Sequence, residues 1–401
     1  MRRLLFMGCL SYLLTGCTHV IFGAVLPELL NHYGRSYSDG GLLVFLEFGG
    51  FLLGVLTSPA LSRRISRRST IMTAFGLLFL AMIAIVMLPP WPVAVSLSFL
   101  AGIAFGLVES SISTFVLMAA KDKQASAFSK LEVFFGLGAL IMPVVSSLLI
   151  ANGLWKYGFM LLGVSALLTG VIWSKLSLGE HDALLAHKAD RTKQEEKPPA
   201  LTKSSLTFLI LFMLVFFIYV GMENTIVNFL PSIFIDQLNT SSSVSSLAVT
   251  AYWIAMVAGR LFAGVLAEKM TYFRYLAVSF GGSLVTVILW LFSSQLWSSF
   301  AVVLLLGIFM SGMFAVALIY ANQLLPGRTE QTTSTLIAAG GLGGSILPLG
   351  VGWGMDKFAV GLSIWFVLAG MCIVFGIVVY SRKWKVQGAK RHDTTEARQA
   401  V

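Results

Sequence analysis

Long apolar runs separated by short polar segments set the pattern of this chain. A window of about 19 residues, close to the length that crosses a bilayer core, predicts six helices in the first half, over residues 4–31, 40–62, 69–89, 92–119, 130–152 and 155–175. It predicts six more in the second half, over residues 206–235, 244–267, 272–293, 296–320, 333–354 and 360–381. The pattern therefore indicates an all-α membrane protein with twelve transmembrane helices in two six-helix bundles.

The same pattern divides the chain into four parts. Residues 1–175 and 205–381 form the two predicted bundles, the polar residues 176–204 a cytoplasmic linker, and residues 382–401 a cytoplasmic tail. The start of the chain, where Arg2 and Arg3 precede an apolar run to Cys17, is similar to a lipoprotein signal. The run continues to Leu26, which is too long for a cleaved segment, so a retained first helix is the favoured interpretation.

Composition excludes an ordinary soluble protein. The chain is 57% hydrophobic and only 11% charged, with a mean hydropathy of +0.85, whereas soluble domains are about one quarter charged. No ten-residue alternation typical of an outer-membrane barrel occurs. The three cysteines lie in apolar runs without metal-ligand spacing, so we expect neither a metal site nor a cofactor.

The basic residues report the orientation of the helices. The net charge is +10, and with the N-terminus inside, 24 of the 28 Lys and Arg residues fall in inner segments. This distribution follows the positive-inside rule and removes the case for a nucleic-acid partner. We therefore predict a multi-pass protein of the plasma membrane, here a bacterial inner membrane, with both termini cytoplasmic.

The two halves repeat one another at a nearly constant offset. Leu26-Pro27 matches Leu230-Pro231 after 204 residues, and Gly136-Leu137-Gly138 matches Gly341-Leu342-Gly343 after 205. Repeats of this kind are typical of secondary transporters, whose substrate binds near the bilayer midplane between the halves. The small-xxx-small glycine pairs fit helices that must slide, although helix packing alone also explains each pair. They are Gly50/Gly54, Gly102/Gly106, Gly340/Gly344 and Gly350/Gly354.

Ionisable side chains inside the spans are the first candidates for a site. Each costs about 2.5–3.5 kcal/mol at the centre of a helix, so each is a functional hypothesis. Glu109 lies midway along the fourth helix, while His19 and Glu223 occupy equivalent positions, 204 residues apart, in the first and seventh. We predict that these three take part in proton coupling. A structural ion pair remains open for Glu109 and a simple interhelix hydrogen bond for His19.

A second group supplies hydrogen bonds and aromatic faces for a polyhydroxylated ligand. Asn224 and Asn228, four residues apart, share one face of the seventh helix. The predicted substrate-binding residues are Glu132, Asn224, Asn228, Gln323, Trp253 and Phe135. Glu132 also fits a helix cap or an ion pair with Lys130 or Arg260, and Arg260 a structural or gating role. Glu47 is expected to face the outer mouth.

Several motifs resemble a known family. The two-bundle plan with basic inner loops is similar to the major facilitator superfamily, whose loop motif survives as Gly264, Glu268 and Lys269, a gating or structural element with Arg260. Leu107-Val108-Glu109-Ser110-Ser111 and the segment around Glu132 resemble its fucose/galactose/glucose:proton symporter family. That resemblance implies a proton-coupling role for Glu109 and sugar contact for Glu132. The aspartate of the family's fucose member has no acidic counterpart here, where Phe22 and Gly23 stand.

The expected function is secondary active transport. We predict proton-coupled uptake of a small polar solute through alternating access, and the resemblance implies a hexose such as glucose or mannose. The alternative is a proton-driven antiporter that exports drugs or metabolites, against which the fifth helix lacks a Gly-Pro dipeptide. An enzyme is not expected, because no nucleophile–base pair or metal-ligand set occurs in the spans. The expected partners are the sugar, protons and membrane lipid, with the chain as a monomer.

Overall fold

The computed structural model describes residues 2–120, 124–177, 202–326 and 328–384. Its first half contains α1 (Arg2–Ala24), α2 (Leu26–Tyr33), α3 (Tyr37–Ile65), α4 (Arg67–Val86), α5 (Trp91–Ala120), α6 (Gln124–Ala151) and α7 (Tyr157–Lys175). Its second half contains α9 (Lys203–Leu238), α10 (Ser242–Met270), α11 (Tyr272–Leu291), α12 (Leu296–Met310), α13 (Met313–Leu324), α14 (Thr329–Lys357) and α15 (Leu362–Tyr380). Within these residues, twelve helical stretches are long and apolar enough to cross a membrane.

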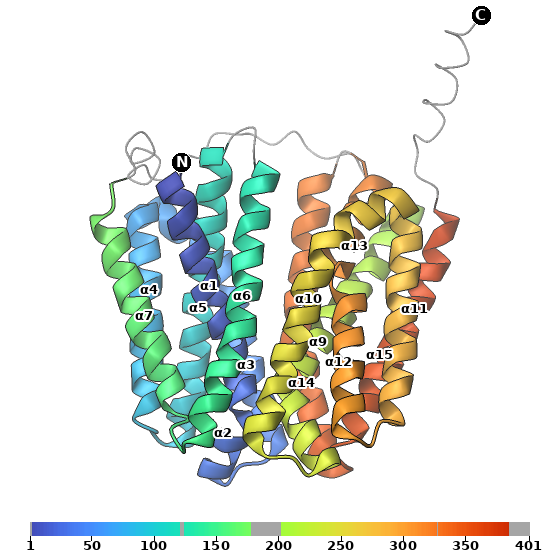
Figure 1. Cartoon of the computed structure of the whole chain (residues 1–401). Coiled ribbons are helices and arrows are strands. Elements are labelled where there is room, and N and C mark those ends of the chain that lie inside the picture. Colours follow the sequence, from blue (N-terminus) through green and yellow to red (C-terminus); the bar gives the residue numbers. More distant parts are fainter. Residues whose placement is uncertain (1, 121–123, 178–201, 327, 385–401) are drawn as a thin grey trace, which may run out of the picture.

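The helices form two bundles that stand side by side, α1–α7 in one and α9–α15 in the other (Figure 1). The chain enters α1 and leaves α15 at the same face of the molecule, which we call the termini face. The short helix α2 lies at the opposite face, which we call the α2 face. The all-α fold with two six-helix bundles predicted from the apolar pattern is confirmed.

Two predicted helices are interrupted. The first, predicted over 4–31, is divided at Val25 into α1 and α2, where Pro27 occupies the first turn of α2 and has no N–H to continue the ladder. The tenth, predicted over 296–320, stops at Met310 and resumes at Met313 as α13. A Cβ on Gly312 would lie 2.1 Å from the Tyr275 hydroxyl, so only glycine fits this break.

The predicted glycine pairs explain how closely two of the helices approach. A Cβ on Gly50 would lie 2.2 Å from the carbonyl oxygen of Phe99, and one on Gly102 would lie 1.9 Å from that of Glu47. The α3 and α5 backbones therefore touch, and any larger residue would push them apart. Gly350, by contrast, has no atom within 4 Å of its Cβ position.

Parts of the linker and tail predictions fall outside the described residues. Of the predicted linker, the structure describes residues 176–177 and 202–204, and of the predicted tail, residues 382–384. At the edge of the tail, the indole N–H of Trp384 donates to the Ser204 hydroxyl at 2.8 Å. This contact fixes the end of the second bundle to the start of α9.

Candidate functional site

The two bundles meet along a polar seam between the α2 face and the middle of the spans. On one side α6 contacts α10: the Ser147 and Ser243 hydroxyls lie 2.9 Å apart, and the Thr250 hydroxyl donates to the Leu140 carbonyl at 3.3 Å. On the other side α3 contacts α14, where the Ser345 hydroxyl donates to the Phe45 carbonyl at 2.8 Å. We call these contacts the seam.

Asp356 completes the seam at the α2 face. Its two carboxylate oxygens accept hydrogen bonds from the backbone N–H of Tyr37 at 2.8 Å and of Ser38 at 2.6 Å, and the Ser38 hydroxyl also donates to it. These groups form the first turn of α3, where N–H groups lack helical partners and the helix dipole favours an anion. A carboxylate of the second bundle thus caps a helix of the first.

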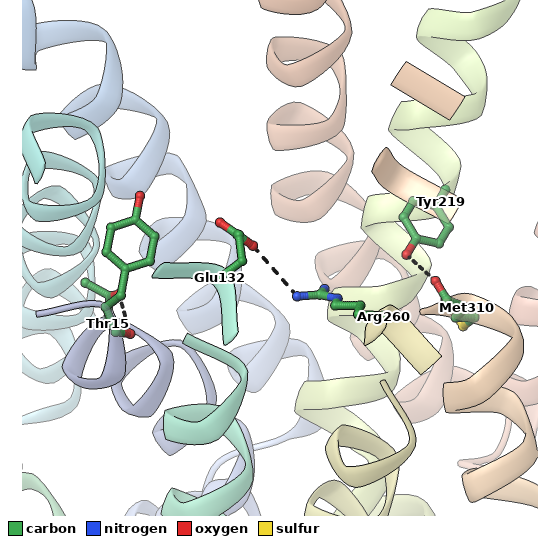
Figure 2. A network of polar contacts seen from close by, with 6 residues as sticks. Thr15, Glu132, Tyr219, Arg260 and Met310 are labelled. Carbon is green, nitrogen blue, oxygen red and sulfur yellow. Dashed lines mark hydrogen bonds and ion pairs between the residues drawn. The ribbon is translucent and has the colours of Figure 1, made fainter. Parts of the chain in front are cut away.

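Beyond the seam, toward the termini face, an ion pair connects the bundles. Arg260 on α10 points toward Glu132 on α6, with 3.8 Å between Nη1 and Oε2 (Figure 2). The guanidinium also lies 5.6 Å from the centre of the Trp253 ring, which adds a cation–π contact. The two side chains are 29% and 39% exposed, so solvent reaches this pair. Of the partners considered for Glu132, the structure selects Arg260.

An aromatic cluster surrounds His19 at the level of this pair. Its ring centre lies 5.4 to 6.1 Å from those of Phe48 on α3, Phe105 on α5, Phe135 on α6 and Trp253 on α10. His19 is buried, and its Nδ1 has no hydrogen-bond partner, nor has the Trp253 Nε1. Five helices from both bundles thus place two polar ring atoms without partners at the centre of the molecule.

The predicted Asn face of α9 borders the same region. The Asn228 Nδ2 donates to the Asn224 carbonyl at 2.9 Å, which leaves the Asn228 Oδ1 and the Asn224 Nδ2 buried without partners. A Cβ on Gly23 of α1 would lie 2.6 Å from the Asn228 Cα, so α9 and the first bundle touch here. Buried polar atoms normally have partners, and their absence here is what a ligand site needs.

The two other predicted carboxyl groups flank the ion pair. Glu109 on α5 is close enough to Glu132 for their charges to interact, and Glu223 on α9 interacts with both Arg260 and Glu132. The Tyr219 hydroxyl, one turn from Glu223, donates at 3.0 Å to the Met310 carbonyl that the break after α12 leaves free (Figure 2). Three carboxyl groups and one guanidinium therefore occupy one layer.

Some predicted residues lie elsewhere. Gln323 is exposed near the end of α13, one turn beyond Tyr320, whose ring contacts Phe208 and Phe212 at the start of α9. Lys269 is exposed in the last turn of α10, and the side chain of Glu268 falls outside those that the structure describes. These residues are not brought together with the central layer.

Three residues that contribute to the site or to the seam did not stand out in the sequence. Phe48 and Phe105 complete the cluster around His19, but they are two of 30 phenylalanines and nothing in their spacing distinguishes them. Asp356 is near the end of a span, where a carboxylate is ordinary. Glu47, which we expected to face the outer mouth, is buried in this structure, with 1% of its surface exposed.

Comparison with known proteins shows which family this architecture resembles. A model of the Major Facilitator Superfamily matches residues 8–232 and 211–399. The glucose/mannose transporter GlcP of Bacillus subtilis is 26% identical over 395 residues, covering 95% of both chains. Among solved structures, a D-xylose-proton symporter superposes with a TM-score of 0.76 at 16% identity, covering 95% of this chain and 97% of that one. The E. coli fucose:proton symporter FucP gives 0.60 at 15%, covering 94% and 98%.

Proposed function

The chain belongs to the major facilitator superfamily, and from this premise we propose that it takes up a hexose together with protons by alternating access. Members of this family are transporters, and the chain is one of them rather than an enzyme. The relative named as a glucose/mannose transporter supports a sugar as the substrate, because it matches nearly the whole chain.

The observation that carries the proposal is the Glu132–Arg260 pair between the bundles, surrounded by polar atoms without partners. Sugar hydroxyls both donate and accept, so they suit the Asn228 Oδ1, the Asn224 Nδ2 and the Trp253 Nε1. The faces of Phe135 and Trp253 suit the apolar side of a sugar ring. A drug-sized apolar substrate would leave these polar atoms unsatisfied, at a cost of about 1–3 kcal/mol each.

The charges of the layer support proton coupling. Glu109, Glu132 and Glu223 interact with one another or with Arg260, and a single guanidinium cannot compensate three carboxylates in a partly enclosed chamber. At least one carboxyl group is therefore neutral in this arrangement, and we infer that it ionises when its surroundings change during transport. We assign this alternation to Glu109, because the charge of Arg260 acts on Glu132 and Glu223, whereas the charged group that acts on Glu109 is another carboxyl, Glu132.

The basic residues suggest the orientation of the protein in the membrane, and the seam suggests its conformation. We take the termini face as cytoplasmic because the basic residues gather there. The seam closes the α2 face, while Glu132 and Arg260 are partly exposed. The structure then corresponds to the state that opens toward the cytoplasm, and the Asp356 contact with the start of α3 closes the outer side. Sugar uptake requires this contact to break once in each cycle.

The proposal is tested on the purified chain in liposomes. An alkaline interior should drive accumulation of labelled glucose or mannose above the external concentration, and a protonophore should abolish it. Sugars lacking the ring hydroxyls serve as the control and should not accumulate. Extrusion of toxic dyes without any sugar accumulation would contradict the proposal and favour the antiporter alternative.

A further inference from the structure

An open pocket lies at the α2 face of the second bundle, outside the transport chamber. Its volume is about 650 Å³. Its walls come from the ends of α9, α11 and α14 and from the start of α15, which all lie at this face (Figure 1). None of its residues belongs to the central layer or to the seam. The residues that give it its chemistry are Gln237, Leu291, Lys357, Phe358, Leu362 and Trp365.

The pocket lies at the level where the apolar spans end. Leu291 and Lys357 are the last residues of two candidate spans, and Leu362 is the first residue of another. Two large aromatic side chains of the pocket are exposed, Phe358 at 67% and Trp365 at 55%. Exposed aromatic residues at the ends of spans are typical of the boundary between membrane and water. The mouth of the pocket therefore lies among the lipid headgroups.

Lys357 supplies a cation at this level. At the α2 face, the described basic residues are Arg35, Lys156 and Lys357. The guanidinium of Arg35 lies 5.8 Å from the centre of the Trp91 ring, and the ammonium of Lys156 lies 5.6 Å from that of the Tyr157 ring. The ammonium of Lys357 is exposed and forms no hydrogen bond, ion pair or ring contact with the described residues. It is therefore available to an anionic group of a ligand.

The surrounding groups limit the charge of that ligand. A Cβ on Gly361 would lie 3.4 Å from the Gln237 Nε2, so this amide reaches the turn between α14 and α15 and adds hydrogen-bond donors. Gln237 and Lys357 each follow an acidic residue in the chain, Asp236 and Asp356. One ammonium near two carboxylates does not suit a multiply charged anion. A phosphodiester, which carries a single negative charge, matches one ammonium and a neutral amide.

From the pocket, an apolar stripe continues along the exposed side of α15. Exposed residues recur there every three or four positions, as on one face of a helix, and all are apolar or small. They are Trp365, Ala369, Cys372, Gly376 and Val379. No atom lies within 4 Å of the Cβ position of Gly376, so space remains open beside the helix. An acyl chain can lie along this stripe, whereas a free phosphate would gain nothing from it.

We propose that this pocket is a binding site for one phospholipid. The Lys357 ammonium binds the phosphate, and the Gln237 amide donates to a phosphate or ester oxygen. Trp365 packs at the level of the glycerol, and one acyl chain lies along the stripe of α15. The inference requires only that the spans cross a bilayer. It rests on neither the sugar nor the proton, so it can fail while the proposed function holds, and the reverse.

Native mass spectrometry of the full chain, stripped of lipid in detergent, measures this binding directly. The protein is titrated with phosphatidylethanolamine, phosphatidylglycerol or a diacylglycerol that has the same acyl chains. Both phospholipids should bind at least about fivefold more tightly than the diacylglycerol, because only they carry the phosphodiester that pairs with the ammonium. Glycerophosphoethanolamine, which has the headgroup without the chains, should not compete with them.

Substitutions then locate the bound lipid. Lys357→Gln and Lys357→Met should each weaken binding of the first phospholipid about fivefold, whereas Lys357→Arg should retain it. If one neutral variant fails to fold, the other still decides. Lys156→Met, at the same face, is the matched control and should leave binding unchanged. The inference is overturned by equal binding to the neutral Lys357 variants and the parent, by equal binding of diacylglycerol, or by competition from glycerophosphoethanolamine, which would indicate a site for soluble phosphate esters.

Discussion

At the scale of residues, the central layer consists of groups that are chemically unusual for their depth. Asn224 and Asn228 bury one amide atom each without a partner, although most buried polar atoms in proteins are bonded. Thr225, between them, differs because its hydroxyl donates to the Gly221 carbonyl of its own helix at 2.7 Å. The neighbouring positions thus offer a matched pair of substitutions.

Asn228→Ala should weaken sugar binding about fivefold, the equivalent of one hydrogen bond worth about 1 kcal/mol. The reason is that the Asn228 Oδ1 is free to accept a bond from a sugar hydroxyl. Thr225→Ala removes a hydroxyl that is already satisfied and should leave affinity unchanged. Binding of labelled hexose to the purified protein measures both, and equal effects of the two variants would speak against sugar contact by Asn228.

The Glu132–Arg260 pair should hold the bundles together in the cytoplasm-open state. The reporter is Gly49→Cys in a background with Cys9, Cys17 and Cys372 replaced by serine; the nearest atom to the Gly49 Cβ position is the Ser345 Oγ at 3.8 Å, so a small side chain fits. Glu132→Gln or Arg260→Met should each raise its labelling by an impermeant maleimide from the α2 side by about fivefold, since a partly exposed pair contributes about 1 kcal/mol or less. The double variant should label no faster than either single one, because the pair is already lost. Lys269→Met, exposed at the end of the same helix, is the control. Additive effects of the two substitutions would show that the residues act separately.

The sequence could single out candidate site residues where the apolar background makes a side chain rare. Glu109, Glu132, Glu223 and His19 stand out because charges and imidazoles are costly in a span, and the structure gathers them in one region. Their roles remain predictions. The aromatic partners of His19 could not be predicted from the sequence. Five helices meet around His19, and the way they cross decides which phenylalanines contact it.

At the scale of elements, the junction of α3 and α14 controls access from the α2 face. The α3 backbone contacts α14 at Gly41 and Phe45, and Asp356 caps its first turn. Asp39 lies in the same turn, but its carboxylate accepts only from Ser36 of its own bundle among the hydrogen bonds of the described residues. The two aspartates therefore share a helix end and differ in whether they connect the bundles.

Asp356→Ala should shift the protein toward the state that opens at the α2 face. It removes bonds from two backbone N–H groups and one hydroxyl to a charged acceptor, so labelling of Gly49→Cys from outside should rise roughly tenfold. Asp39→Ala should have little effect on this labelling, although it weakens a helix cap. Indistinguishable labelling of the Asp356→Ala variant and the parent would exclude Asp356 as a closing contact.

The apolar runs predicted the helix positions to within a few residues. A transmembrane segment must form its backbone hydrogen bonds internally and must be as long as the bilayer core is thick. The break at Ser311 and Gly312 was not predicted. It depends on the Tyr275 hydroxyl of α11 occupying the place of a side chain and on Tyr219 of α9 satisfying the freed Met310 carbonyl. Both are contacts between helices far apart in sequence.

At the scale of the whole molecule, the proposed direction of transport rests on the distribution of basic residues between the two faces. The bundles close on the α2 face and expose the charged layer on the other side, while the basic residues gather at the termini face. Transport inward by this protein requires the α2 face to be external.

The topology can be measured with two cysteines in the background lacking native ones. Asn152→Cys, in the loop between α6 and α7, should react with an impermeant maleimide in intact cells, and Lys203→Cys, at the start of α9, only after the membrane is permeabilised. Because both residues are exposed, burial does not account for a difference. The reverse pattern of labelling would invert the proposed orientation.

The central claim is that a carboxyl group in the layer between the bundles couples proton movement to sugar movement. Glu109→Gln tests it most directly, because the amide keeps the size of the side chain but cannot ionise. In liposomes, we predict that this variant still exchanges labelled hexose across the membrane at equal sugar concentrations, while accumulation driven by an imposed pH gradient is abolished. Accumulation by Glu109→Gln at the level of the unsubstituted chain would contradict the account.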